Sequence, residues 1–146
     1  MAKAVLSLIF ILFSLSVHAG PQSDALGTCL TDNTNGKERK ELAQWIFIAI
    51  SAHPEMSNLS SVSKQDREKS NKGMADIVMR LLTEDCAIQA RAAVNAEGGE
   101  GLESSFKVLG RIAMQEIMSN QSVSTSIADY VKFLDQKKLR SALAHE

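Results

Sequence analysis

The chain has 146 residues, of which 45% are hydrophobic and 23% charged, and its formal net charge is −1. This length suits one domain with a sizeable core. Neither sign of charge gathers in one half, which argues against a nucleic-acid-binding protein or a protein that binds anionic membranes.

The first 19 residues have the pattern of a secretory signal peptide. Lys3 gives a positive start, residues 4–17 are almost all apolar, and Ala19 precedes Gly20. This apolar run falls short of the roughly 20 residues that a membrane-spanning helix needs. We predict cleavage near Ala19/Gly20, a periplasmic or secreted location, and no membrane span afterwards. The mature domain, 20–146, then has 127 residues and a net charge of −2, because Lys3 is removed.

The rest of the chain has helical periodicity. Apolar residues three and four positions apart predict amphipathic helices, and no window alternates as a strand would. We expect an all-α fold, a single-domain bundle of about five helices with one disulfide. The expected helices are roughly 36–52, 64–82, 84–96, 102–118 and 124–143, with Thr83 as a cap or kink between the second and third.

Start and stop signals support these helices. Three pairs place a capping side chain three residues before an acid, a pattern that satisfies the free amides of a first turn. Pro54 ends the first helix near Ala52, because the residue before proline avoids the α region. The stretch 97–101 is the clearest break. The capping pairs are Asn35 with Glu38, Ser63 with Asp66, and Ser126 with Asp129.

Both cysteines, Cys29 and Cys86, lie in the exported part. An even pair in an oxidising compartment favours a disulfide. A bond that closes this loop would stabilise the fold by about 4 kcal/mol in the chain-entropy model. The spacing excludes a catalytic CxxC motif, and the chain has too few cysteines and histidines for a typical zinc site.

The polar segment CLTDNTNGKERK, residues 29–40, allows three interpretations. Asn33, Asn35 and Gly36 match the middle of a calcium loop, but Thr31 and Leu42 occupy the two end positions, where acidic ligands belong. A phosphate-binding loop would need a glycine at Thr31 and a preceding strand. We favour a capped, disulfide-pinned helix start, with Glu38 at the positive helix terminus.

Residues 29–56 resemble a pattern in small exported (periplasmic) proteins of Gram-negative bacteria whose function is uncharacterised. The resemblance implies a periplasmic, all-helical domain, and it implies no activity or ligand. It rests on Cys29, Leu30, Asp32, Gly36, Arg39, Lys40, Trp45, Phe47, Ala52, His53, Pro54 and Glu55.

Trp45, Phe47 and His53 are the candidate contact residues. The helix around Trp45 is apolar nearly all round, which favours burial on most sides. If one side stays uncovered, Trp45 or Phe47 could anchor a partner or line an apolar pocket. His53 suits a helix C-terminus, where the dipole stabilises its charge. The alternative is a general base or metal ligand, although His145 is the only other histidine of the mature chain.

No catalytic or metal site is assigned, and no cofactor is expected. Met114 and Met118 share a helix face, but no methionine and histidine cluster suggests copper. No nucleophile elbow or zinc-protease motif occurs. We expect a non-catalytic binding or interaction module of the cell envelope, whose partner is another envelope protein or a second copy. The alternatives are a carrier of a small apolar ligand between helices, and a hydrolase or thiol enzyme that uses His53.

Overall fold

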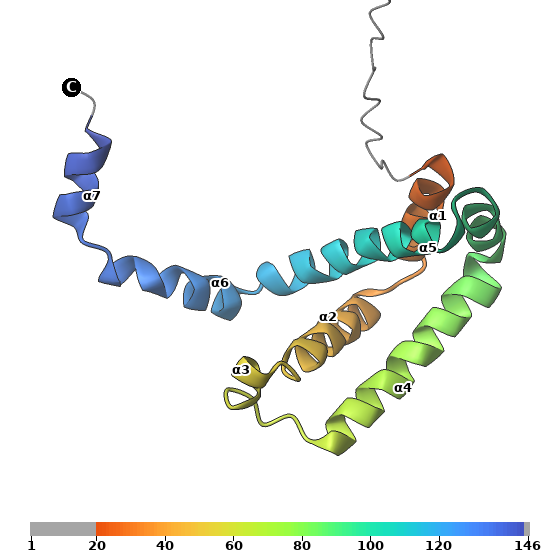
Figure 1. The fold of residues 1–146 in the computed structure, drawn as a ribbon, viewed down its shortest axis with the longest axis horizontal. Coiled ribbons are helices and arrows are strands. Elements are labelled where there is room, and N and C mark those ends of the chain that lie inside the picture. The colour runs from red at the N-terminus through yellow and green to blue at the C-terminus, as the bar shows by residue number, and fades with distance from the viewer. Residues whose placement is uncertain (1–19, 145–146) are drawn as a thin grey trace, which may run out of the picture.

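The computed structural model describes residues 20–144. The predicted signal segment lies outside them, so its cleavage stays a prediction. Within this range the chain is all-helical and has no strand, which confirms the predicted fold class (Figure 1). The elements are α1 (Pro21–Asp32), α2 (Gly36–Ile50), α3 (Pro54–Ser57), α4 (Lys64–Arg80), the π-turn η1 (Leu81–Asp85), α5 (Ala87–Met118), α6 (Gln121–Ala128), the 3₁₀ turn η2 (Asp129–Phe133) and α7 (Gln136–Leu143).

The expected count of about five helices is wrong, because the described residues form seven α-helices. Helices α1 and α3 were not predicted. The predicted helices 84–96 and 102–118 correspond to the two parts of α5, which a kink at Gly98 separates. The predicted helix 124–143 is divided into α6, η2 and α7.

Helix α1 packs along α5 and supplies much of the core. Leu26 and Leu30, four residues apart, are both completely buried. The two helices approach closely because small residues lie between them: a Cβ added at Gly27 would come within 3.1 Å of Val108. The Ser105 hydroxyl donates a 2.9 Å hydrogen bond to the backbone oxygen of Ser23 on α1. Two leucines alone are a weak sequence signal, so this helix depends on its contact with α5.

Helices α4 and α5 diverge from the turn η1, and α2 lies between them and contacts both (Figure 1). The capping boxes of Asn35 with Glu38 and Ser63 with Asp66 are confirmed at the starts of α2 and α4. The pair of Ser126 with Asp129 is wrong as a helix start, since α6 begins earlier. The buried apolar residues of the core are Leu26, Leu30, Leu42, Ala43, Leu81, Cys86, Ala90, Ala93, Leu109 and Ala113.

Cys29 and Cys86 lie at disulfide distance, with their sulfur atoms 2.05 Å apart, as the sequence predicted. The pair connects α1 to the residue between η1 and α5. The π-turn η1, which contains Thr83, supplies the kink expected there. Helix α4 therefore ends near Cys86, and the chain turns back as α5 over α1 and α2.

The predicted break at 97–101 is confined to one residue. Gly98 has φ +63° and ψ −147°, whereas the residues on either side are helical. A residue with a Cβ rarely adopts this conformation. The break divides α5 into two helical segments at Gly98, where the sequence predicted an interruption.

Residues 119–144 form a C-terminal arm that extends away from the helices before it (Figure 1). Asn120 caps α6, and Asp135 caps α7 by accepting a 2.9 Å hydrogen bond from the Lys138 amide. Leu134 has an extended backbone between η2 and α7. The prediction that this segment is a continuous helix of the bundle is wrong, because no core surface lies beneath it and the local caps divide it.

We predict that Gly98→Ala lowers the free energy of unfolding by about 1–3 kcal/mol, because alanine is strained at a positive φ. Gly99→Ala is the matched control. Gly99 is helical and a Cβ there would meet no atom within 4 Å, so we expect a gain of about 0.4–1 kcal/mol. Urea unfolding followed by circular dichroism measures both. Equal effects of the two variants would contradict the assigned kink.

Replacement of both cysteines, Cys29→Ser with Cys86→Ser, should lower the free energy of unfolding by about 2–4 kcal/mol, because the unfolded chain regains the freedom of the loop that the bond closes. Denaturant titration of the variant and of oxidised and reduced wild type checks this. Intact mass after alkylation without reductant is the control. Two alkylated thiols in protein purified from the periplasm would refute the bond.

Candidate functional site

The polar segment 29–40 forms a junction between helices. Thr34 is buried, and its hydroxyl donates a 3.1 Å hydrogen bond to the Leu30 carbonyl. Arg39 pairs with Glu116 of α5 at 2.8 Å. Glu38 pairs with Arg80 of α4 at 2.7 Å. The capped helix start is therefore the interpretation that the structure favours, and the polar side chains bind other helices.

Residues that could hold a metal ion do not gather in the described chain. No group of three or more His, Cys, Asp or Glu side chains within residues 20–144 has the necessary geometry. Glu38 of the polar segment is instead paired with Arg80. The calcium interpretation, which the sequence already made unfavourable, has no support in this arrangement.

Trp45 is half-buried on α2, and its Nε1 donates a 2.9 Å hydrogen bond to Asn71 Oδ1 of α4. Phe47 and Ile50 are each 57% exposed. The expectation that α2 is buried on most sides is thus wrong, because only α4 and α5 cover it among the described elements. Its third side, with Phe47 and Ile50, is open.

An open groove of about 480 Å³ lies between α2, α4 and the loop before α4. Its apolar residues are Phe47, Ile48, Val62 and Met74. Polar and charged side chains share the same walls. The full lining is Glu41, Gln44, Phe47, Ile48, Ser61, Val62, Asp66, Lys69, Ser70, Gly73 and Met74.

Arg67 follows Asp66, a residue of the groove lining, in α4. It donates hydrogen bonds from α4 to the Ile48 carbonyl and, at 3.4 Å, to the Ser51 hydroxyl, and so holds the last turn of α2. Asp66 beside it accepts a 2.6 Å hydrogen bond from the Ser63 hydroxyl. That hydroxyl, with the Ser63 amide, lowers the pKa of Asp66, which keeps the groove wall negative.

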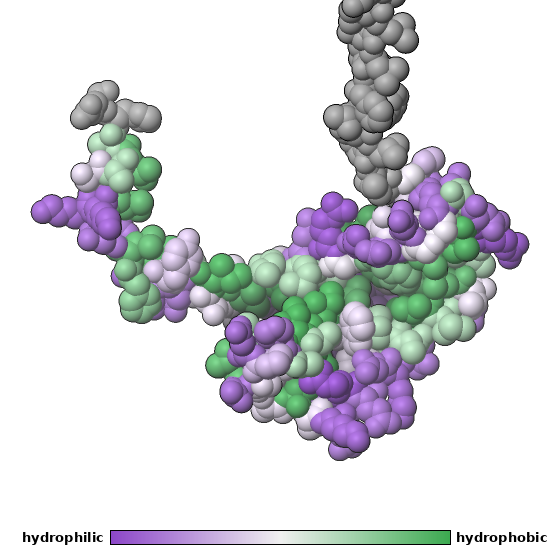
Figure 2. Space-filling model, in the orientation of Figure 1, coloured by the Kyte–Doolittle hydropathy of each residue, from purple (hydrophilic) through white to green (hydrophobic). Residues whose placement is uncertain are grey.

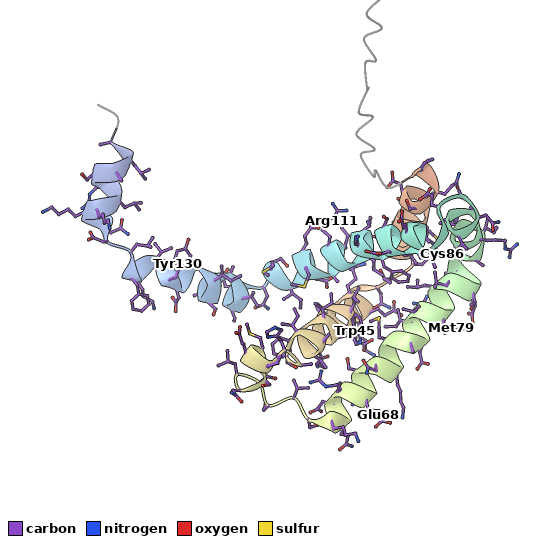
Figure 3. The ribbon with its side chains drawn as sticks, in the orientation of Figure 1. Trp45, Glu68, Met79, Cys86, Arg111 and Tyr130 are labelled. Carbon is purple, nitrogen blue, oxygen red and sulfur yellow. A yellow bond between two sulfur atoms is a disulfide. The ribbon has the colours of Figure 1, made fainter. Side chains whose placement is uncertain are left out.

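His53 is exposed at the start of α3, where its Nδ1 accepts a 3.3 Å hydrogen bond from the Glu55 amide. The predicted role at the C-terminus of the first helix is therefore corrected: the imidazole caps the helix that follows. Pro54 starts α3, a position where its missing N–H costs nothing. Figure 3 labels Cys86 at the opposite end of the body, residues 20–118, from α3. Neither sulfur is brought to His53, so no nucleophile and base pair forms.

An apolar void between α2, α4 and α5 has a volume of only about 10 Å³. Leu42, Met74, Leu81 and Leu109 are among the residues around it. This is about the space of one water molecule. The interior of the described body therefore offers no room for an apolar ligand there.

The C-terminal arm exposes a large share of apolar side chains, visible as green surface along it in Figure 2. Figure 3 shows Tyr130 on the arm, far from Trp45. Part of this segment falls in the predicted bundle helix 124–143, whose apolar side chains we expect to be covered. Its exposed residues are Ile127, Tyr130, Val131, Phe133, Leu134, Leu139 and Leu143.

Comparison of the chain with models of protein families, with curated proteins and with solved structures finds no match. The candidate site is thus argued from its own geometry. Among the helices of residues 20–144, none combines the length and the apolar character needed to cross a bilayer.

Replacement of Arg67 by alanine should lower the free energy of unfolding by about 1–2 kcal/mol, because two acceptors on α2 lose a charged donor. Amide exchange of residues 44–51 should accelerate. Lys72→Ala is the control: its exposed pair with Glu68 should contribute under about 0.5 kcal/mol. Unchanged amide exchange at the end of α2 would show that Arg67 does not stabilise the last turn of this helix.

Proposed function

We propose that this protein is a non-catalytic binding module of the cell envelope that binds helical segments of a protein partner through its uncovered apolar surfaces. The observation that carries the proposal is the C-terminal arm, in which seven large hydrophobic side chains are at least 41% exposed. Contiguous apolar surface of this kind is typical of interaction sites in soluble proteins.

The arm supplies amphipathic helices that lack a partner within the described chain. On α7, Leu139 and Leu143 are four residues apart and therefore share a face, while Lys137, Lys138 and Arg140 make the helix basic. A helix of this kind binds by laying its apolar face in a groove. Because basic residues surround the leucines, we expect an acidic rim on the groove that receives it.

The groove between α2 and α4 has features of such a receptor. Phe47 and Met74 supply apolar contact, and the lining holds two acids, Glu41 and Asp66, against one base, Lys69. These features favour a second copy of this chain as the partner, since each copy carries both an arm and a groove. Another envelope protein that presents a basic amphipathic helix would meet the same chemistry.

The alternative of a small apolar ligand rests on the size of the same groove. A volume of about 480 Å³ falls within the range of about 300–1,000 Å³ of ligand sites. The groove is open and its lining mixes charged with apolar residues, which suits a peptide helix better than an apolar small molecule. We therefore place the carrier function second.

The proposed location in the periplasm rests on the N-terminal sequence pattern and on the cysteine pair. A disulfide persists in an oxidising compartment. No hydrolase or thiol activity is proposed, because His53 is engaged with a backbone amide and both cysteines are consumed in the pair.

The double variant Val131→Asp with Leu139→Asp should lose association by at least about tenfold, because charges would have to be buried at the contact. Both residues are exposed, so the melting temperature should stay near that of wild type. Light scattering of the mature tagged chain measures self-association, and capture from envelope extract reports other partners. Ser124→Asp, a polar and exposed position on the same arm, is the matched control.

A wild-type chain that stays monomeric at high concentration and captures no protein would contradict the proposal. Phe47→Asp tests the groove separately. If it weakens self-association as the arm variant does, the arm and the groove belong to one interface. Retention of full affinity in Phe47→Asp would assign the contact to the arm alone.

A further inference from the structure

The carboxylate of Glu97 lies at the start of α1. Its Oε1 accepts hydrogen bonds from the backbone amides of Gln22, at 3.1 Å, and Ser23, at 3.3 Å. Glu97 belongs to α5, immediately before the Gly98 kink. The first turn of α1, whose amides have no partner inside the helix, is thus capped by a side chain 74 residues or more away in sequence.

Gly20, the residue before α1, is in direct contact with the same carboxylate. A Cβ atom added to Gly20 would overlap Glu97. A side chain at this position, which the sequence pattern places first after the predicted cut, would therefore displace the Glu97 carboxylate. Gly20 has a negative φ of −74°, so its conformation alone does not demand glycine.

The charge of Glu97 has no cationic side chain beside it. Within residues 20–144 the ion pairs of lysine and arginine involve other acids. Hydrogen bonding by Ser23, through its hydroxyl and its amide, and by the Gln22 and Gly20 amides lowers the pKa of Glu97, which outweighs partial burial. The carboxylate is therefore ionised at neutral pH.

We propose that Glu97 binds the α-ammonium group that proteolytic removal of residues 1–19 creates on Gly20. Hydrolysis of the bond between Ala19 and Gly20 by a leader peptidase consumes one water. It leaves a carboxyl group on Ala19 and an amine on Gly20, and this amine takes up a proton below its usual pKa of about 7.7–8.0. The inference rests on the predicted cleavage and is independent of the proposed binding function.

Cleavage would change the chemical character of the donor at Gly20. The Gly20 nitrogen, which the structure places as a neutral amide donor to Glu97, becomes a charged donor. A charge-assisted hydrogen bond is about twice as strong as a neutral one. Since α1 carries Leu26 and Leu30 into the core, the ion pair would fasten the helix on which the core depends.

The site also discriminates between cleavage positions. A cut one residue earlier would leave an extra residue before Gly20 and move the charge away from Glu97. A cut one residue later would leave Pro21 as the terminus and remove the Gly20 nitrogen altogether. Only cleavage before Gly20 places the ammonium next to the carboxylate.

The stabilisation by the pair of the Glu97 carboxylate and the Gly20 ammonium should decrease both at low pH and at high pH. The pKa of the Glu97 carboxyl is lowered in the folded state. Its contribution to the free energy of unfolding is therefore present above the pKa of the unfolded state, and it is lost as the pH falls through the pKa of the folded state. The ammonium pKa should be raised by its partner, so its contribution is complete below the unfolded pKa and is lost as the pH rises through the folded one. Stabilisation by the pair is therefore complete between about pH 5 and about pH 7.5 and is lost progressively at lower and at higher pH.

The test compares two forms of the chain, one that begins at Gly20 and one with a single serine before Gly20. We expect Glu97→Gln to lower the melting temperature of the first form by about 2–5 °C more than that of the second at pH 6.5. This difference should vanish near pH 10. Glu100→Gln, an exposed acid three residues along α5, is the matched control and should not distinguish the two forms.

Two further measurements keep the inference testable if Glu97→Gln folds poorly. Sequencing of the exported protein should give Gly20 as its first residue. Titration of ¹⁵N-labelled Gly20 should show an amino-group pKa above the ordinary value in wild type. Gly20→Ala should bring it back towards that value, because the added methyl displaces the carboxylate. A different terminus, an unshifted amino group, or equal effects of Glu97→Gln in both forms would overturn the proposal.

Discussion

The contact between α1 and α5 is the constraint on which the rest of the body depends. Gly27 allows the helices to approach closely, and Leu26 and Leu30 then enter the core without exposure to solvent. The cysteine pair joins the same two regions covalently at one end of α1, and Glu97 caps the other end. Three different interactions therefore hold one short helix that has little helical tendency of its own.

The polar segment after α1 connects this pair of helices to α2 and α4. Glu38 and Arg39 of α2 reach α4 and α5 through arginine–carboxylate pairs with Arg80 and Glu116. These pairs are only partly exposed, and each joins segments far apart in the sequence. Ion pairs thus join the helices where they meet, whereas the far end of α2 and the arm keep uncovered apolar side chains.

Local sequence signals predicted the elements whose stabilisation is local. The capping boxes at Asn35 and Ser63 were found because both of their partners lie within four residues, and the long stripes of α4 and α5 give a periodic signal. Helix α1 was missed, since its stability comes from α5 rather than from its own pattern. The arm was taken for a bundle helix because periodicity reports amphipathicity and does not report what covers the apolar face.

The sequence by itself determined the all-helical class and the pairing of the only two cysteines. Only the tertiary structure decided that Phe47 lines a groove, that His53 caps a separate turn, and that Glu97 lies against Gly20. The physical reason is range: periodicity and caps act over a few residues, whereas a groove or a long-range carboxylate contact exists only after distant helices have packed.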